Sequence, residues 1–313
     1  MGRFLIARAL SAIPTMLLVS IIVFALMRAI PGDPAKLMLG DLAEPGQVAA
    51  ARAAMGLDEP LAVQFLIWGG DVLSGDLGRS IATGDPVLPV ILDRFAITLT
   101  VAAVAVALAA LIAAPAGMIA AWRQDRPADF AVIAAATLSL SIPSFWLGLI
   151  LLLVFGLTLG WVPIVGFVPV WRDLGAGALY LALPVLTLVL AEFGPLARMT
   201  RASAIEVSRL EYITHARAKG LSERTVMWRH AFPNAFAPTW TLIGLVLGSL
   251  LANMAVTETV FSIPGLGRHL VDAIYARDYP VVQGCLLFIA GIYVAVNLVV
   301  DLLYPLFDPR VAA

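Results

Sequence analysis

The sequence has 313 residues, of which 61% are hydrophobic and 13% are charged, whereas soluble domains have roughly 45–50% and about 25%. One soluble core cannot bury this excess, so the composition predicts an all-α membrane protein with a single transmembrane domain over residues 1–313. The net charge of −1 gives no basic field for nucleic acid, and the single cysteine, Cys285, excludes an intrachain disulfide and a cysteine-based metal cluster.

About six stretches are long and apolar enough to cross a membrane as helices, since about 20 residues span roughly 30 Å of hydrocarbon. The first, residues 9–27, follows Arg3 and Arg8 and lacks a convincing cleavage site, so we expect an uncleaved span rather than a signal peptide. The third contains Pro143 and should end between residues 156 and 163. The other spans are expected at residues 95–122, 178–197, 236–257 and 281–303.

The loops give the orientation, because Lys and Arg concentrate on the cytoplasmic side of a membrane protein. The segment 198–235 carries seven Lys or Arg against three Glu, so we expect it in the cytoplasm together with both termini. Residues 31–94 and 258–280 are then extracytoplasmic. Within the first of these, residues 61–73 have the apolar spacing of a short amphipathic helix.

No segment has the residue pattern of a catalytic, cofactor-binding or metal site. Lys36 and Lys219 are the only lysines, and neither lies in a GxxxxGK[ST] phosphate loop, so ATP and Mg²⁺ would have to bind separate polypeptides. His215, His230 and His269 are not clustered in the sequence. We therefore expect that the chain itself is not an enzyme.

The segment 210–238 predicts two short helices separated by a glycine. Residues 211–219 favour a helix, and Gly220 accepts the left-handed conformation that ends one. Ser222 can cap the second helix, which Pro233 would end before the next span.

Two interpretations of this segment fit the residues. Ala216 and Ala218 make the first helix slim enough to dock into a groove on another protein. An ordinary basic loop that sets topology and touches lipid headgroups explains the same residues, so physics alone leaves both interpretations open.

The segment resembles the EAA loop of ABC importer permeases. When the motif is aligned on Gly220, Ala216 and Pro233 also match it, whereas Thr214 replaces its acidic lead residue. The pattern YI-x-x-A-R-A-K-G-L at 212–221 is similar to the variant found in dipeptide, oligopeptide and nickel permeases. Other segments follow in the order of that family, so the resemblance covers essentially the whole chain: IPGDP at 30–34, GDLGRS at 75–80, RMTRAS at 198–203, and residues 257–284 and 297–310.

The resemblance implies a bundle like that of type I ABC importer permeases, embedded in lipid in the bacterial cytoplasmic (inner) membrane. It implies a second homologous permease, two ABC ATPase subunits and an extracytoplasmic solute-binding protein as partners. In that family each permease inserts one helix into a groove on an ATPase, which holds ATP and Mg²⁺. By position, the docking residues here would be Tyr212, Ile213, Thr214, His215, Ala216, Arg217, Ala218, Lys219, Gly220 and Leu221.

The external segment 264–279 predicts a glycine-punctuated turn followed by an amphipathic helix over residues 270–276. It could form part of an external gate or the seat of the binding protein, or it could be a re-entrant structural plug. The residues expected to serve the gate or the binding protein are Pro264, Gly265, Gly267, Arg268, Asp278 and Tyr279.

The expected function is that of a permease subunit that forms half of a pathway for short peptides or similar small solutes; nickel chelates, glutathione and sugars stay open. A self-sufficient secondary carrier would instead need an ionisable group within a span, Glu192 or Asp301. A scaffold or receptor would predict that loss of Gly220 leaves solute uptake unchanged. No pathway residue is assigned, because the polar candidates could equally serve helix packing: Ser139, Ser141, Asn253 and Asn297.

Overall fold

The structure is a computed structural model that describes residues 2–29, 33–39 and 43–303. The described residues are mostly helical and contain no β-strand beyond one isolated bridge between Arg79 and Pro86. The five long helices are α1 (Gly2–Ala29), α5 (Val87–Trp122), α8 (Leu174–Ser208), α11 (Phe232–Asn253) and α14 (Tyr279–Leu303).

Shorter helices connect or extend these five. At the first connection lie α2 (Pro34–Leu39), α3 (Pro45–Ala54) and α4 (Leu61–Leu73). Between α5 and α8 lie α6 (Pro127–Ser141), α7 (Ser144–Leu151) and the π-helical η1 (Leu152–Thr158). The rest are α9 (Glu211–Ala218), α10 (Glu223–Thr225), the π-helical η2 (Val226–Ala231), α12 (Ala255–Val260) and α13 (Leu266–Tyr275).

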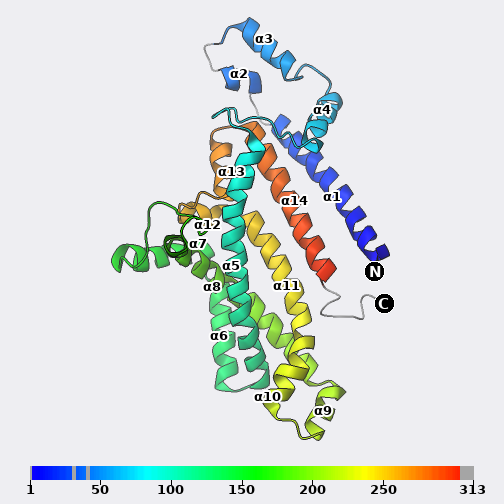
Figure 1. Cartoon of the computed structure of the whole chain (residues 1–313), viewed down its shortest axis with the longest axis vertical. Helices are drawn as coiled ribbons and strands as arrows, with labels where there is room; N and C mark the ends of the chain where they lie inside the picture. The colour runs from blue at the N-terminus through cyan, green and yellow to red at the C-terminus, as the bar shows by residue number, and fades with distance from the viewer. Residues whose placement is uncertain (1, 30–32, 40–42, 304–313) are drawn as a thin grey trace.

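The long helices run along the longest axis of the molecule, and α7 and α12 lie at one side of the bundle about halfway along it (Figure 1). The helices α2, α3 and α4 lie at one end, and α9 and α10 lie at the other. Since α5 has 36 residues and a helix rises about 1.5 Å per residue, it is longer than the hydrocarbon core is thick. It therefore links the two ends of the molecule.

Small residues bring the central helices close together. The buried face of α5 is rich in alanine and packs against α8 and α11. A Cβ atom added at Gly117 of α5 would overlap the backbone carbonyl of Ala197 on α8. Small side chains let helix backbones approach and are typical of interfaces between helices in membranes. The core of the fold is thus the α5–α8–α11 contact.

The expectation of about six spans is confirmed with one change of shape. Five helical runs are long and apolar enough to cross a membrane, and a sixth span requires α6 and the α7–η1 helix to be counted together. These two are bent by 98° around Ile142 and Pro143. Proline lacks the N–H group that an unbroken helix would use and its ring clashes with the preceding turn, so the third span is broken at Pro143 and is not a continuous helix.

Other boundaries differ from the expected ones by up to eleven residues, the largest difference being that α8 runs on to Ser208 beyond the expected end at residue 197. The helix at residues 61–73 is confirmed as α4. The second span begins at Val87 and not at residue 95, so that Asp93 and Arg94 lie within α5. The fifth span, α11, ends at Asn253 and not at residue 257, and the separate α12 follows it. Helix α13 begins at Leu266, four residues before the predicted start at residue 270.

Candidate functional site

The predicted helix–glycine–helix element is confirmed, and we call it the α9–α10 knob (residues 211–225). Helix α9 begins at Glu211, whose negative charge suits the positive end of the helix dipole. Gly220 has a φ of 79°, the left-handed conformation that glycine adopts at low cost. The Ser222 side chain accepts a hydrogen bond from the Thr225 N–H at 3.4 Å and so caps α10.

One face of α9 packs against the rest of the chain. Ile213 is fully buried and Ala216 is 7% exposed. Both belong to a hydrophobic cluster that includes Met118 of α5, Ala204 of α8 and Val226 of η2. Ala216 therefore contacts the chain's own interior, whereas Ala218, the other alanine expected to dock, is exposed.

Arg217 braces the knob from within the chain. Its Nε donates to Glu223 Oε1 at 2.8 Å, and its Nη2 donates to Glu223 Oε2 at 3.2 Å. The indole N–H of Trp122, at the end of α5, donates to the same carboxylate at 2.8 Å, and the guanidinium lies 5.5 Å from the Trp122 ring centroid. Sequence reasoning missed this trio, because Trp122 is about a hundred residues away along the chain.

A second tie joins α9 to the start of α11. The Asn234 side-chain amide donates to the Tyr212 hydroxyl at 2.9 Å. That hydroxyl in turn donates to the backbone oxygen of His230 at 3.4 Å. The knob is thus held on both sides, and its orientation relative to the bundle is fixed by polar contacts as well as by packing.

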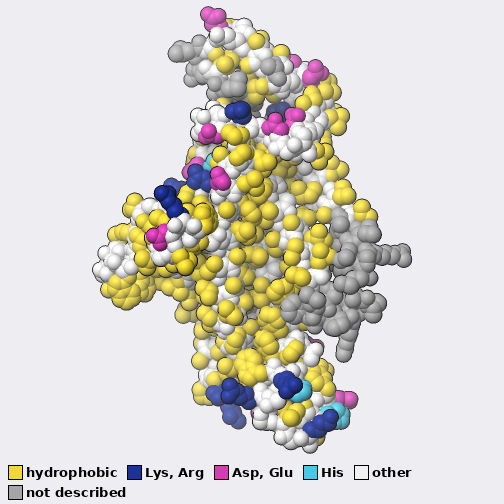
Figure 2. All heavy atoms as spheres, in the orientation of Figure 1, with side chains coloured by type: hydrophobic (Ala, Val, Ile, Leu, Met, Phe, Trp, Pro, Cys, Tyr) yellow, Lys and Arg dark blue, Asp and Glu magenta, His cyan; other side chains and the backbone are white. Residues whose placement is uncertain are grey.

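The opposite face of α9 is exposed. It presents side chains that face away from the buried cluster, with Lys219, Gly220 and Leu221 following at its end: Glu211, Thr214, His215 and Ala218. Basic side chains (Lys or Arg) and histidines gather at this end of the molecule (Figure 2). A slim, exposed helix on a rigid support has the shape of an element that docks into a groove on another protein.

The expectation that Pro233 ends the second helix is wrong. The chain stays helical from Glu223 to Asn253, and Pro233 lies in the first turn of α11. The π-helical η2 immediately precedes it. Proline is tolerated in the first turn of a helix, where its N–H is not needed, and the wider π-helical turn takes up the change. The knob is therefore continuous with the fifth span.

At the side of the bundle away from the knob, α12 and α13 form a corner around one buried acid. Glu258 is fully buried, and its carboxylate accepts hydrogen bonds from the Thr98 hydroxyl and, at 2.8 Å, from the Arg268 N–H. The Thr98 hydroxyl also accepts from the Leu266 N–H at 2.8 Å. Burial raises the pKa of Glu258, and these hydrogen bonds oppose the rise. This acid was not among the predicted site residues.

The same corner explains two of the predicted glycines. A Cβ atom added at Gly265 would overlap the Glu258 carboxylate, and one at Gly267 would overlap the backbone of Ala255. Pro264 accepts a hydrogen bond on its carbonyl from Arg94 Nη1 at 3.1 Å. These residues therefore serve first to close the α12–α13 corner.

Replacing Gly265 or Gly267 by alanine is expected to lower the stability of the chain, by about 1–3 kcal/mol for each added methyl group that must be accommodated. The matched control is Gly46→Ala in α3, where an added Cβ meets no atom within 4 Å. The measurement is the melting temperature in detergent, followed by the reaction of a thiol-specific fluorophore with the buried Cys285. Equal melting temperatures for the three variants would contradict the described packing.

Asp278 joins two segments that the sequence had singled out separately. It is 3% exposed, and its carboxylate accepts hydrogen bonds from the Ser80 hydroxyl and from the N–H groups of Ile81 at 3.1 Å and Ala82 at 3.3 Å. These contacts, which we call the Asp278 latch, fix the GDLGRS segment to the start of α14. Two other residues were predicted here. The Nε atom of Arg268 lies 3.9 Å from Oδ2 of Asp272, and Tyr279 is buried.

The variant Asp278→Ala is expected to free the loop 75–86, because it removes a buried carboxylate that accepts three hydrogen bonds. Each hydrogen bond to a charged group contributes about 1.5–3 kcal/mol. Limited proteolysis should cut this loop faster in the variant than in wild type. Asp85→Ala, which removes an exposed acid from the same loop, should leave the rate unchanged, and equal cutting of all three proteins would rule out the latch.

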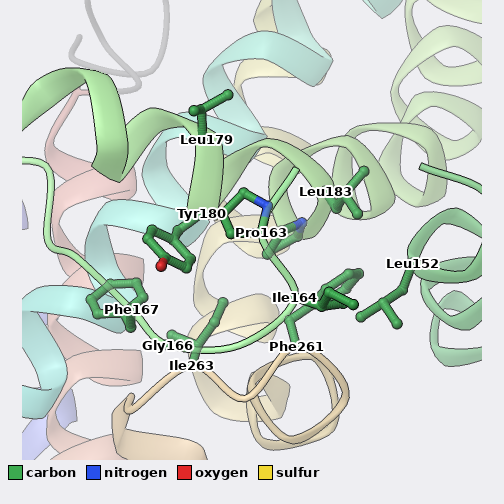
Figure 3. Close-up of a pocket in the computed structure, with 11 residues that line it drawn as sticks. Leu152, Pro163, Ile164, Gly166, Phe167, Leu179, Tyr180, Leu183, Phe261 and Ile263 are labelled. Atoms are coloured by element: carbon green, nitrogen blue, oxygen red, sulfur yellow. The ribbon is translucent and has the colours of Figure 1, made fainter. Parts of the chain in front are cut away.

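The long loop before α8 covers the same side of the bundle. Figure 3 shows Ile164 close to Phe261, which follows α12, and Tyr180 of α8 lies beside Gly166. The Tyr180 hydroxyl donates to the Val165 carbonyl at 3.3 Å. These residues leave only a small pocket, lined mainly by hydrophobic residues, and the corner is thus closed by packing.

The polar candidates for a pathway mostly bond to helix backbones. Ser139 donates to the Leu190 carbonyl, Ser141 to the Thr137 carbonyl and Asn253 to the Ser249 carbonyl, as polar residues do in helix packing. Glu192 and Asn297 are half-buried. The Asp301 side chain and much of the segments 30–34 and 297–310 lie outside the described residues. We assign no solute-binding residue.

The bundle and the knob together define a multi-span membrane protein with an exposed helical element at one end. Comparison with protein families gives the particular class. Residues 113–313 match the family described as "Binding-protein-dependent transport system inner membrane component". Residues 1–102 match its N-terminal companion, "Binding-prot-dependent transport system membrane comp, N-term". The chain belongs to this family of permease components of ABC importers, which reside in the bacterial inner membrane.

Individual relatives match over their full length. A putative peptide transport system permease protein of Brucella suis is 43% identical over 312 residues, 99% of each chain. The di/tripeptide transport system permease protein DppB of Pseudomonas aeruginosa is 39% identical over 98% of each chain. The glutathione transport system permease protein GsiC of Escherichia coli is 39% identical over 99% of each chain. A solved amino acid ABC transporter with histidines is 18% identical, with a TM-score of 0.48 over 71% of this chain and 94% of that one.

Proposed function

We propose that this chain forms half of the pathway of an ATP-driven importer and that α9 transmits the force of ATP hydrolysis from a separate ATPase. The observation that carries the proposal is the exposed face of α9 on a braced support. The Arg217–Glu223–Trp122 contacts tie α9 to the end of α5, so a push on α9 would move the central helix of the bundle. ATP and Mg²⁺ would be held by the partner.

The docking face follows from burial. Thr214, His215 and Ala218 would enter the ATPase groove, and Lys219 could pair with an acid at its rim. Ile213 and Ala216 would support the helix from behind, and Arg217 would hold Glu223 rather than the ATPase. This division refines the expectation that all residues from 212 to 221 dock.

The proposed topology puts the knob and both termini in the cytoplasm and the α2–α4 end in the extracytoplasmic space. The positive residues of the segment 198–235 support it. The α12–α13 corner and the Asp278 latch would then face outward, where they could seat a binding protein or form part of a gate. A second, homologous permease would supply the other half of the pathway.

Short peptides are the proposed solute class. The support is the names of full-length relatives, which include peptide, di/tripeptide and glutathione transport systems. Glutathione is itself a tripeptide, so the three names share an amide-linked solute of a few residues. Choice among such solutes would rest largely with the binding protein.

Co-purification tests the assembly. When the chain is produced with candidate ATPase and permease partners, a mild-detergent preparation is expected to contain all of them at fixed ratios. Purification of the chain alone, combined with peptide uptake by that single chain under an ion gradient, would favour a secondary carrier. Glu192→Gln would then be the first variant to test.

A further inference from the structure

Helix α4 is apolar on the side that packs and on the side that does not. Its sequence, LAVQFLIWGGDVL, has one charged residue, Asp71. The exposed side carries large hydrophobic residues: Leu66 is 71% exposed, Leu73 is 90% exposed, and Val63 and Ile67 are also exposed. In water, a contiguous apolar surface of this kind is rare on a soluble segment unless something covers it.

The packed side of α4 fixes its position beside α1. The Phe24 ring of α1 lies 5.4 Å from the Phe65 ring and 5.6 Å from the Trp68 ring, measured between centroids. Gln64 is buried, and its side-chain amide donates to the backbone oxygens of Leu57 at 3.1 Å and Glu59 at 2.8 Å. The exposed apolar side is therefore a stable feature of the fold.

An apolar groove lies between α4, α1 and α14. Its walls include Met16 and Leu17 of α1, Trp68 and Leu73 of α4, and Phe288 of α14. The groove opens beside α1, which is the least buried of the long helices. Only 17% of its apolar stretch is buried inside the protein, against 28–44% for the other four long helical runs. The groove is thus continuous with the part of the bundle that faces lipid.

We propose that α4 lies in the membrane interface with its exposed side towards lipid, and that the groove holds an acyl chain of a membrane lipid. Continuity with the lipid-facing surface carries the choice of occupant: hydrophobic side chains cover the middle of the main body of the molecule, whereas charged ones lie at its two ends and on the lobe at its side (Figure 2). Tryptophan is enriched at the membrane interface, which suits Trp68. Helices with an apolar face lie in this layer.

This inference uses the membrane-spanning arrangement and not the docking role of α9, so either can fail alone. It changes the picture of residues 31–94, which the sequence presented as a partly ordered excursion outside the membrane. Residues 61–73 of that segment would instead be a membrane anchor for the loop that Asp278 holds.

Spin labels test the position of α4 in the full-length chain. In a Cys285→Ser background, one label each is placed by Leu66→Cys on α4, by Leu18→Cys on the exposed side of α1 and by Ala50→Cys on the exposed side of α3. The chain is reconstituted in phosphatidylethanolamine–phosphatidylglycerol vesicles. Power saturation then compares access of oxygen, which concentrates in hydrocarbon, with access of a water-soluble nickel chelate.

The label at residue 66 is expected to favour oxygen over nickel, as the label at residue 18 does, whereas the label at residue 50 favours nickel. Nickel access at residue 66 equal to that at residue 50 would overturn the proposal. Low access to both reagents that develops only in the assembled complex would assign the surface to a protein partner, and would overturn it as well.

Fluorescence of the unlabelled protein gives a second measurement that needs no label on α4. Lipids brominated on their acyl chains should quench wild type more than Trp68→Phe, since only wild type has an indole at the groove. Equal fractional quenching of the two proteins would show that no acyl chain reaches the groove.

Discussion

Replacing Ala218 by arginine is expected to release the ATPase from the permease while the permease itself stays folded. Ala218 is the last residue of α9, on its exposed face, and is itself exposed. A large charged side chain there can extend into water in the free chain, but it would meet the wall of any groove that receives α9. Disruption of an interface contact that dominates binding costs about 2 kcal/mol or more, which weakens binding at least roughly 30-fold.

Two matched variants give this result its meaning. Ala216→Arg places the same charge two residues away but inside the hydrophobic cluster, so it should lower the melting temperature of the chain as well as remove the ATPase. Ala50→Arg adds the charge at an exposed site on α3 and should change neither. Full ATPase recovery with Ala218→Arg would remove α9 from the interface.

Removing Asp129 is expected to destabilise the chain more than any surface substitution. Arg201 of α8 binds it in a two-pronged ion pair, with Nε–Oδ1 at 2.6 Å and Nη2–Oδ2 at 2.7 Å. Asp129 is 3% exposed. Asp129→Ala leaves the Arg201 charge without this partner, and breaking a buried pair in this way costs about 3 kcal/mol or more.

The double variant Asp129→Leu/Arg201→Met should recover much of that loss, because it removes both charges together. As a control, Arg52→Ala breaks a more exposed pair with Asp33 and Asp58, and such pairs contribute about 0–1 kcal/mol. Melting temperatures from Cys285 reactivity compare the four proteins. An Asp129→Ala variant as stable as wild type would contradict a structural role for the Asp129–Arg201 pair.

Much of the fold could be predicted because lipid and water impose strong patterns on the sequence. Apolar stretches of about 20 residues located the spans, and the Gly220 and Ser222 signals located the knob. The 98° bend at Pro143 could not be predicted in its size, since proline breaks a helix but tertiary packing sets the angle. Pro233 was wrongly predicted to end a helix. A helix interior and a helix start tolerate proline very differently, and the sequence does not show which of the two positions Pro233 occupies.

The candidate site was predicted by position and not by orientation. The segment 212–221 was found from its resemblance to a family, but which of its residues face outward depends on η2, α5 and α8, which lie elsewhere in the sequence. Ala216 and Ala218 look equivalent in the sequence, yet one is buried and the other exposed. Glu258 was missed because an acid after an apolar span looks like the start of a loop, and only the fold brings Thr98 to it.

Uptake of a radiolabelled tripeptide into proteoliposomes tests the central claim most directly, namely that this chain conducts solute when α9 is engaged by an ATPase. The vesicles hold the complete complex, with the binding protein on one side and ATP on the ATPase side. We predict ATP-dependent uptake with wild type and none with Ala218→Arg. Uptake that proceeds without ATP, or that survives Ala218→Arg unchanged, would contradict the account.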